Sequence, residues 1–412
     1  MDATGEEPQE IQLNSALLNA CYDGDMEKVT SILDKGASVF CSDETGRTPL
    51  HFAAASGNIA TIKCVLDAGI PWNSLDDGKY SAGDYALETA NSKEAYDYLV
   101  EFGYTTELVL KELGTFQVPI TTIDSSATSS LVSPTPSSGT KPASSENSNQ
   151  VSDSDLKKIS NSDYLNSSIT YIGDRLLDAH NNGVMMEWEE PIMYQHALAI
   201  CQREPENPKP TQSSLKVLNV GFGMGIIDTI LQSFNPTLHV IVEAHPDVYS
   251  HMVSEGWTRK KNVVVLFGRW QDKLSELYEL GQFDGIFFDT FGEFYQDLDQ
   301  FHQAIFRPDS KIEAEVAATT GEPASTAPLL APDGVYSFFN GLGGHNLLFH
   351  DVYCKVVQFD LEKLGVDTTF VPISVDDNSI SEEAWEGINR PYWMLKQYNM
   401  PICKISKDTH AV

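Results

Sequence analysis

Three glycines at every second position break an apolar run near the middle of the chain. Residues 217–225 read VLNVGFGMG, so a strand over 217–220 would leave its sheet through Gly221, Gly223 and Gly225. Glycine permits positive φ angles and lets backbone N–H groups approach a ligand that a Cβ atom would hold away. The segment therefore predicts a buried strand followed by a turn that holds a nucleotide-like cofactor. For the turn alone, an ordinary tight connection between strand and helix is the alternative.

An acidic residue follows the turn at an informative distance. Residues 239–242 form a second strand-like run, and Glu243 comes 22 residues after Gly221. A carboxylate at about this offset accepts ribose hydroxyls in a Rossmann-like unit. A dinucleotide fingerprint requires G-x-G-x-x-G, whereas the spacing here is G-x-G-x-G, the form seen in S-adenosylmethionine (SAM) enzymes. We therefore expect SAM as the cofactor.

Charge and composition narrow the classes of function. The chain has 412 residues, of which 41% are hydrophobic, so it can bury more than one core. Its 59 acidic and 27 basic residues give a formal net charge of −32. This charge repels nucleic acid and anionic lipid and suits a basic protein substrate, while acidity that serves solubility alone is the alternative.

The cysteines and the N-terminus bear on the compartment. The six cysteines are scattered without a C-x-x-C pair, which indicates neither a disulfide framework nor a zinc site. The acidic N-terminus does not read as a signal peptide, and no apolar run approaches the roughly 20 residues of a membrane span. We therefore expect an intracellular protein without a metal site.

The first part of the chain carries a repeat of 33 residues. Residues 46–54 read GRTPLHFAA, which matches the ankyrin pattern T-P-L-H-x-A, and a shift by 33 residues aligns further alanines, glycines and leucines. A third copy is degenerate and keeps only the turn at 77–81, as a capping repeat would. We predict an all-α ankyrin module over 1–116 that binds protein, with His51 hydrogen-bonded inside its repeat.

Composition divides the rest of the chain. Residues 117–154 are rich in Ser, Thr, Pro, Asn and Gly, which predicts a flexible linker that leaves the two folded parts free to reorient. Residues 155–412 alternate strand-like and helix-like segments, as a doubly wound α/β domain does. An Ala/Thr/Glu-rich stretch at 307–328 interrupts this rhythm and reads as an exposed insertion.

The expected fold of 155–412 is a seven-stranded Rossmann-like methyltransferase sheet with a late hairpin. Its strands are predicted at 217–220, 239–242, 263–267, 283–288, 335–339, 367–372 and 392–395, with an edge after Pro401. Helices are expected between them at 225–234, 246–255, 271–280 and 297–306.

Carboxylates beside the cofactor turn are the candidate catalytic groups. Ligands of open α/β sheets bind beyond the carboxyl ends of the strands, and the strand 283–288 delivers Asp289 to that edge. A cationic substrate would neutralise a carboxylate there, while capping of a turn or helix is the alternative role. A second acidic cluster contains Glu187, Glu189 and Glu190. Two carboxylates facing a sulfonium cofactor indicate a bound guanidinium.

Several motifs together resemble the guanidino-group methyltransferases, which include guanidinoacetate methyltransferase. They are VMMEWEEPIMYQHAL, VGFGMGI, VEAH, GRWQD, FDGIFFDTF and YWMLKQYNMP. With ankyrin repeats ahead of this domain, the layout is similar to the fungal protein arginine N-methyltransferase 2 family, whose members methylate the internal δ nitrogen of arginine. The resemblance implies a SAM-dependent arginine N-methyltransferase of cytoplasm and nucleus. It implies a basic protein substrate, with a large-subunit ribosomal protein as the candidate, and we expect a monomer.

The resemblance also assigns site residues. It implies that Glu189 and Asp289 grip the guanidinium, while Glu187 and Glu190 stay as alternative partners. Contacts with SAM are implied at Tyr164, Met185, Phe222, Gly223, Met224, Gly225, Ile226, Ile227, Glu243, Ala244, His245, Trp270, Gln271 and Asp289. Two other functions remain open, a small-molecule guanidino methyltransferase and an ankyrin scaffold with a vestigial methyltransferase domain.

Overall fold

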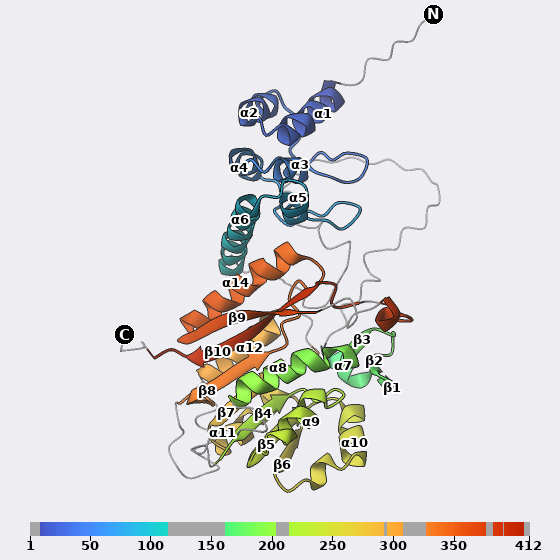
Figure 1. Cartoon of the computed structure of the whole chain (residues 1–412), viewed down its shortest axis with the longest axis vertical. Helices are drawn as coiled ribbons and strands as arrows, with labels where there is room; N and C mark the ends of the chain where they lie inside the picture. Colours follow the sequence, from blue (N-terminus) through green and yellow to red (C-terminus); the bar gives the residue numbers. More distant parts are fainter. Residues whose placement is uncertain are drawn as a thin grey trace, which may run out of the picture.

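The computed structural model describes residues 9–113, 161–202, 214–291, 295–307, 327–375, 382–389 and 391–407. The predicted linker at 117–154 and most of the predicted insertion at 307–328 lie outside these residues. A helical module sits at one end of an α/β domain (Figure 1). Across the described residues, no helix has the length and apolar character needed to cross a membrane.

Pairs of helices build the N-terminal module. They are α1 (Gln9–Tyr22) with α2 (Met26–Asp34), α3 (Pro49–Ser56) with α4 (Ile59–Asp67), and α5 (Ala82–Glu88) with α6 (Lys93–Glu112). Thr48 and Ser81 begin α3 and α5 with capping boxes, which satisfy the free N–H groups of the first turn. The degenerate third repeat is therefore a complete helix pair.

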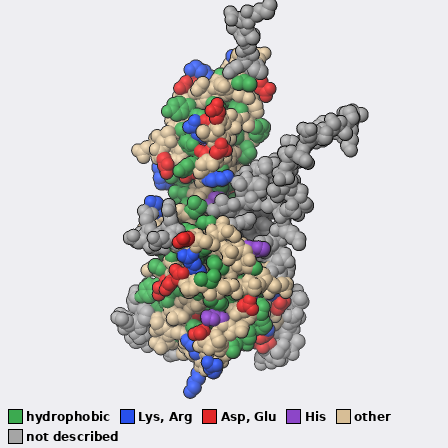
Figure 2. Space-filling model, turned by 90° about the vertical axis from the view of Figure 1, so that its right-hand side faces the viewer, with side chains coloured by type: hydrophobic (Ala, Val, Ile, Leu, Met, Phe, Trp, Pro, Cys, Tyr) green, Lys and Arg blue, Asp and Glu red, His purple; other side chains and the backbone are tan. Residues whose placement is uncertain are grey.

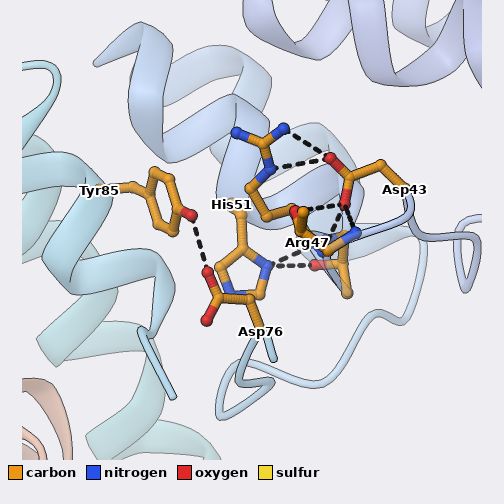
Figure 3. Close-up of polar contacts among 7 residues, drawn as sticks. Asp43, Arg47, His51, Asp76 and Tyr85 are labelled. Atoms are coloured by element: carbon orange, nitrogen blue, oxygen red, sulfur yellow. Dashed lines mark hydrogen bonds and ion pairs between the residues drawn. The ribbon is translucent and has the colours of Figure 1, made fainter. Parts of the chain in front are cut away.

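Hydrogen bonds tie each repeat loop to the next. His51 is buried, its Nδ1 accepts from the Thr48 N–H (3.0 Å), and its Nε2 therefore donates to the Tyr80 carbonyl (3.1 Å). The predicted role of His51 is confirmed. Figure 3 shows the neighbouring pairs, in which Asp43 accepts from Arg47 (2.6 Å) and Asp76 accepts from the Tyr85 hydroxyl. The bond from His51 to Tyr80 joins the two loops, whereas the other two pairs each stabilise a single repeat.

The α/β domain is built on a seven-stranded sheet in the order β6-β5-β4-β7-β8-β10-β9. The strands are β4 (Lys216–Val220), β5 (Leu238–Glu243), β6 (Val263–Phe267), β7 (Phe283–Phe288), β8 (Leu330–Phe338), β9 (Val366–Ser374) and β10 (Gln397–Ile405). The first five strands in this order, from β6 through β5, β4 and β7 to β8, pair in parallel. Strand β10 is antiparallel to both of its neighbours, β8 and β9. The predicted seven-stranded Rossmann-like sheet is confirmed.

One predicted strand is wrong. Residues 392–395 form an irregular segment, and the last strand is β10. The apolar side chains of this segment serve packing, because Trp393 is fully buried against the ring of His350. Its indole N–H donates to the Leu395 carbonyl (2.7 Å), so the segment folds back on itself.

Helices cover both faces of the sheet. One face carries α8 (Glu190–Cys201), α9 (Ile226–Ser233) and α10 (Pro246–Ser254), and the other carries α11 (Leu274–Glu279), α12 (Tyr295–Phe306) and α14 (Leu347–Lys363). Alternation of side chains along β4 separates the two cores, since Val217 points to the first face and Leu218 to the second.

A small antiparallel sheet was not predicted. It follows α7 (Asn161–Asn166) and contains β1 (Thr170–Ile172), β2 (Arg175–Leu177) and β3 (Gly183–Met186). The Tyr171 hydroxyl donates to the Gly223 carbonyl (3.0 Å), which places this sheet over the glycine turn.

The ankyrin module packs directly on α14 (Figure 1). Leu348, Phe349 and Val352 of α14 belong to the ankyrin core, and Trp72 meets the Phe349 ring edge to face at 5.4 Å. Polar contacts surround this patch, including a bond from the Tyr96 hydroxyl to Asp351 (2.7 Å). The prediction of two freely reorienting parts is therefore wrong, because buried apolar side chains join them.

Candidate active site

The glycine turn lies at the carboxyl end of β4, between β5 and β7. Gly221, Gly223 and Gly225 have φ angles of 97°, 55° and 71°. Residues that carry a side chain rarely adopt these backbone angles. A Cβ atom at Gly221 would clash with the Asp289 carbonyl, and one at Gly223 would lie 2.7 Å from the Met185 sulfur. The protein itself thus requires glycine here, beyond any need of a ligand.

Glu243 ends β5 beside this turn and is buried. Its Oε2 accepts from the Phe222 N–H (2.9 Å), and its Oε1 accepts from the His245 N–H (2.6 Å). Burial raises the pKa of Glu243, and these bonds oppose the rise. Backbone N–H groups of Ala244 and Gly223 also help to oppose the rise. A carboxylate acceptor beside a glycine turn fits the ribose of a nucleoside-bearing cofactor.

Tyr164 forms a wall next to Glu243. Its ring stacks on Phe291 at 4.0 Å and lies 5.0 Å from the His245 ring, while the His245 side chain bonds the Ser167 carbonyl. Burial raises the pKa of the Tyr164 hydroxyl, and the charges of Glu243 and Asp289 add to this rise. The structure therefore places Tyr164 next to the predicted cofactor residue His245.

The other predicted cofactor residues fall into two groups. The side chains of Phe222, Ile227 and Trp270 are packed into the protein core, Phe222 against Trp257. Half-buried positions around the turn and the following strand ends are Gly223, Met224, Ile226, Ala244 and Gln271. Met185 is buried and its sulfur accepts from the Met224 N–H at 3.2 Å.

Of the acidic cluster, only Glu189 is buried. It is 2% exposed, and its Oε1 accepts from the Met186 N–H (2.8 Å) and from the Tyr392 hydroxyl. Glu187 and Glu190, on either side of it, have exposed side chains. The short 3-10 helix η2 (Glu187–Glu189) makes this difference, because it turns its third residue, Glu189, inward.

Glu189 and Asp289 form an acidic pair, of which Glu189 is the more deeply buried member. Asp289 follows β7 directly, where its N–H donates to the Val220 carbonyl (2.8 Å), and its side chain is half-buried. Burial raises the pKa of Asp289 to about 7. Burial also raises the pKa of Glu189 to about 8, and repulsion by the Asp289 charge adds to this rise. Burial and mutual repulsion thus oppose ionisation of the two carboxyl groups, and a cation bound between them would relieve both effects.

The structure adds polar groups around the acidic pair that the sequence did not assign to the site. Tyr398 lies close enough to both carboxylates for their charges to raise the pKa of its hydroxyl, after burial itself. The Tyr398 oxygen accepts from the Asn340 N–H (2.8 Å) and bonds His196 Nε2 (2.9 Å). Burial lowers the pKa of His196 to about 3, so this imidazole is neutral. Tyr392 and Tyr398 both belong to the motif YWMLKQYNMP, which was the available signal for them.

Comparisons with known families agree with this geometry. Residues 161–317 match the family model of guanidinoacetate N-methyltransferase, and residues 17–66 match that of ankyrin repeats (many copies). With the sheet order and the glycine turn, these matches define a Rossmann-like methyltransferase domain joined to an ankyrin module.

Similar proteins narrow the class further. Protein arginine N-methyltransferase 2 of Saccharomyces cerevisiae is 35% identical over 86% of this chain and 82% of the relative. The Kluyveromyces lactis protein of the same name is 30% identical over 96% of this chain and 94% of its own length. That of Yarrowia lipolytica is 41% identical over 58% of this chain and 46% of the relative. The chain belongs to the protein arginine N-methyltransferase 2 family.

Proposed function

We propose that this chain transfers a methyl group from SAM to the internal δ nitrogen of an arginine in a basic protein. The pair of Glu189 and Asp289 carries the proposal. The pKa values of both carboxyl groups lie near or above neutrality, so the pair by itself resists full ionisation. A guanidinium has a pKa above about 12 and therefore stays charged at neutral pH. It offers five N–H donors in a planar fork, which suits two carboxylates.

The cofactor would be held by the turn and the strand ends around it. Glu243 would accept the ribose hydroxyls, and Tyr164 would cover one side of the site. SAM supplies the methyl group already activated as a sulfonium. We assign no metal to the reaction, since positioning of the acceptor nitrogen supplies the main catalytic effect.

The carboxylates would orient and polarise the acceptor arginine. Hydrogen bonds from its two terminal nitrogens to Glu189 and Asp289 draw positive charge onto those nitrogens. Electron density then remains on the δ nitrogen, which the same bonds aim at the methyl donor. The Tyr392 hydroxyl supports this arrangement, because its bond to Glu189 favours the ionised form of that carboxylate.

Partners and location complete the proposal. We propose an ankyrin module at 1–116 that selects the protein substrate, a linker at 117–154 and a catalytic domain at 155–412 of a monomer in cytoplasm and nucleus. A large-subunit ribosomal protein is the candidate substrate, which the net charge of −32 favours. On the face in Figure 2, acidic and basic side chains are interspersed over the repeats, so on this face the proposed attraction rests on long-range charge and not on a single acidic patch.

Transfer of labelled methyl groups tests the proposal. The full chain is incubated with methyl-labelled SAM and either basic ribosomal proteins or guanidinoacetate, with Asp289→Asn as the control. We expect label on arginine of a protein, and none with the variant. Label on guanidinoacetate alone would favour the small-molecule function, which the family match of residues 161–317 supports. Absence of SAM binding in calorimetry would favour the ankyrin scaffold.

A further inference from the structure

The segment that carries Tyr392 is fastened to the loop 340–346 ahead of α14. The Tyr392 hydroxyl donates to Glu189, and two residues later the Met394 N–H donates to the Gly344 carbonyl (2.8 Å). A Cβ atom at Gly344 would lie 2.6 Å from the Trp393 ring and 2.9 Å from the Tyr392 carbonyl. The loop and the segment are thus packed so closely that displacement of one displaces the other.

The ankyrin module holds the other end of the same loop. Asn346 is 4% exposed, and its Oδ1 accepts from the Leu348 N–H (3.0 Å), which caps α14. Its Nδ2 donates to Asp84 Oδ2 of the ankyrin module (2.9 Å). Asp84 is itself fixed, because the same oxygen accepts from the Ser81 N–H (2.6 Å) and hydroxyl (2.7 Å) in the capping box of α5.

A second series of bonds links the interface to the start of the loop. The Tyr96 hydroxyl of α6 donates to Asp351 (2.7 Å), and Asp351 also accepts from the Asn399 side chain (3.2 Å). The Asn340 side chain donates to the Asn399 carbonyl (3.1 Å), and its N–H donates to the Tyr398 oxygen. Both ends of the loop 340–346 therefore connect an ankyrin helix with a tyrosine beside the acidic pair.

We propose that Asn346 is a positioning residue, which Asp84 of the ankyrin module holds in place so that the loop 340–346 sets Tyr392 on Glu189. The ankyrin module then completes the site that orients the substrate arginine, in addition to selecting the protein that carries it. This inference rests on the function proposed above for Glu189. It predicts that a defect at the ankyrin contact lowers the rate of transfer and leaves binding of SAM and of the protein intact.

Replacement of Asn346 tests the proposal. Asn346→Asp keeps the oxygen that caps α14 but turns a carboxylate oxygen toward Asp84. We expect kcat to fall about tenfold, within the range of about 100-fold that a displacement of 1 Å can cause. The Kd for SAM and the KM for the protein substrate should change less than about twofold. A second variant, Asn346→Ser, keeps a side-chain oxygen that can cap α14, lacks the donor to Asp84 and adds no charge, so its kcat should also fall.

A matched control is Asn58→Asp. Asn58 also caps a helix through its Oδ1, with Ala60 N–H at 2.9 Å, and also donates through its Nδ2, to the Gly24 carbonyl at 3.0 Å. This contact lies within the ankyrin module, so the control should keep the wild-type kcat.

Several outcomes would overturn the inference. They are a wild-type kcat in Asn346→Asp or in Asn346→Ser, and a change confined to KM. Thermal unfolding is measured for each variant. If Asn346→Asp fails to fold while Asn346→Ser folds with the wild-type kcat, the contact serves stability and the positioning role is rejected. A wild-type chain without methyl transfer would instead refute the proposed function itself.

Discussion

Replacement of Asp289 by asparagine should stabilise the ligand-free protein while abolishing its activity. Burial raises the pKa of Asp289 from 3.8 to about 7, so the folded chain binds this proton more tightly than the unfolded chain. The resulting stability is fully present below pH 4 and is lost as the pH rises through about 7. A pKa difference of one between the folded and the unfolded chain corresponds to about 1.4 kcal/mol. The raised pKa of Asp289 therefore makes its ionisation cost about 4 kcal/mol of stability at pH 8.

Asparagine has nearly the same shape and no charge, so it avoids this cost. It also removes the repulsion that contributes to the raised pKa of Glu189. Thermal unfolding of both proteins at pH 4 and pH 8 measures the effect. We expect nearly equal Tm values at pH 4, and at pH 8 a variant that melts at least about 5 °C higher. Methyl transfer should fall by about 100-fold or more.

The opposite stability result would refute this account of the pair. A variant less stable than the wild type at pH 8 would show that Asp289 is stabilised by partners in the folded chain. A gain of the same size at pH 4 and pH 8 would show an effect of packing that is independent of charge. Near-normal turnover would remove Asp289 from the guanidinium site.

Three further changes test other parts of the site. Tyr392→Phe removes the hydroxyl whose bond lowers the pKa of Glu189, so the midpoint of the kcat/KM profile should move to higher pH, and an unchanged profile would contradict this role. Glu243→Gln should weaken SAM binding about tenfold or more in calorimetry, and an unaltered affinity would exclude Glu243 from the cofactor site. Deletion of residues 1–113 exposes three buried apolar side chains of α14, each worth about 1.5–3 kcal/mol, so the remaining domain should have a lower Tm than the full chain. An equally stable truncated domain would show that the contact contributes little.

The cofactor turn and the sheet could be predicted because their signals are local. An apolar run that ends in alternating glycines predicts a strand and its turn without knowledge of the rest of the chain. Asp289 was found in the same way, since it directly follows a strand of six residues, β7. Parallel pairing of β4 with β7 then places Asp289 beside the turn.

The choice of carboxylate could not be predicted from sequence. Glu187, Glu189 and Glu190 lie within four positions, and only the turn of η2 decides which one is buried. The segment 392–395 was wrongly predicted as a strand for a similar reason. A short apolar run is typical of a strand, whether it pairs with another strand or only anchors a loop. Its packing against the distant loop 340–346 depends on contacts across the fold.

The docking of the ankyrin module also depends on long-range contacts. Helix α14 is apolar on two sides, with Leu348 and Val352 toward the repeats and Val356 and Leu361 toward the sheet. From sequence, both sides read as one buried helix, so nothing identifies the second partner. The composition of residues 117–154 suggested independent parts, but a linker determines how far two modules can separate and not whether their surfaces bind.

The site of methylation on arginine tests the central claim most directly. The full chain is supplied with methyl-labelled SAM and a basic ribosomal protein, and the labelled arginine is fragmented in a mass spectrometer to separate the δ nitrogen from the terminal nitrogens. If Glu189 and Asp289 hold the terminal nitrogens, the methyl group must be on the δ nitrogen. A methyl group on a terminal nitrogen, or label in guanidinoacetate only, would contradict the account.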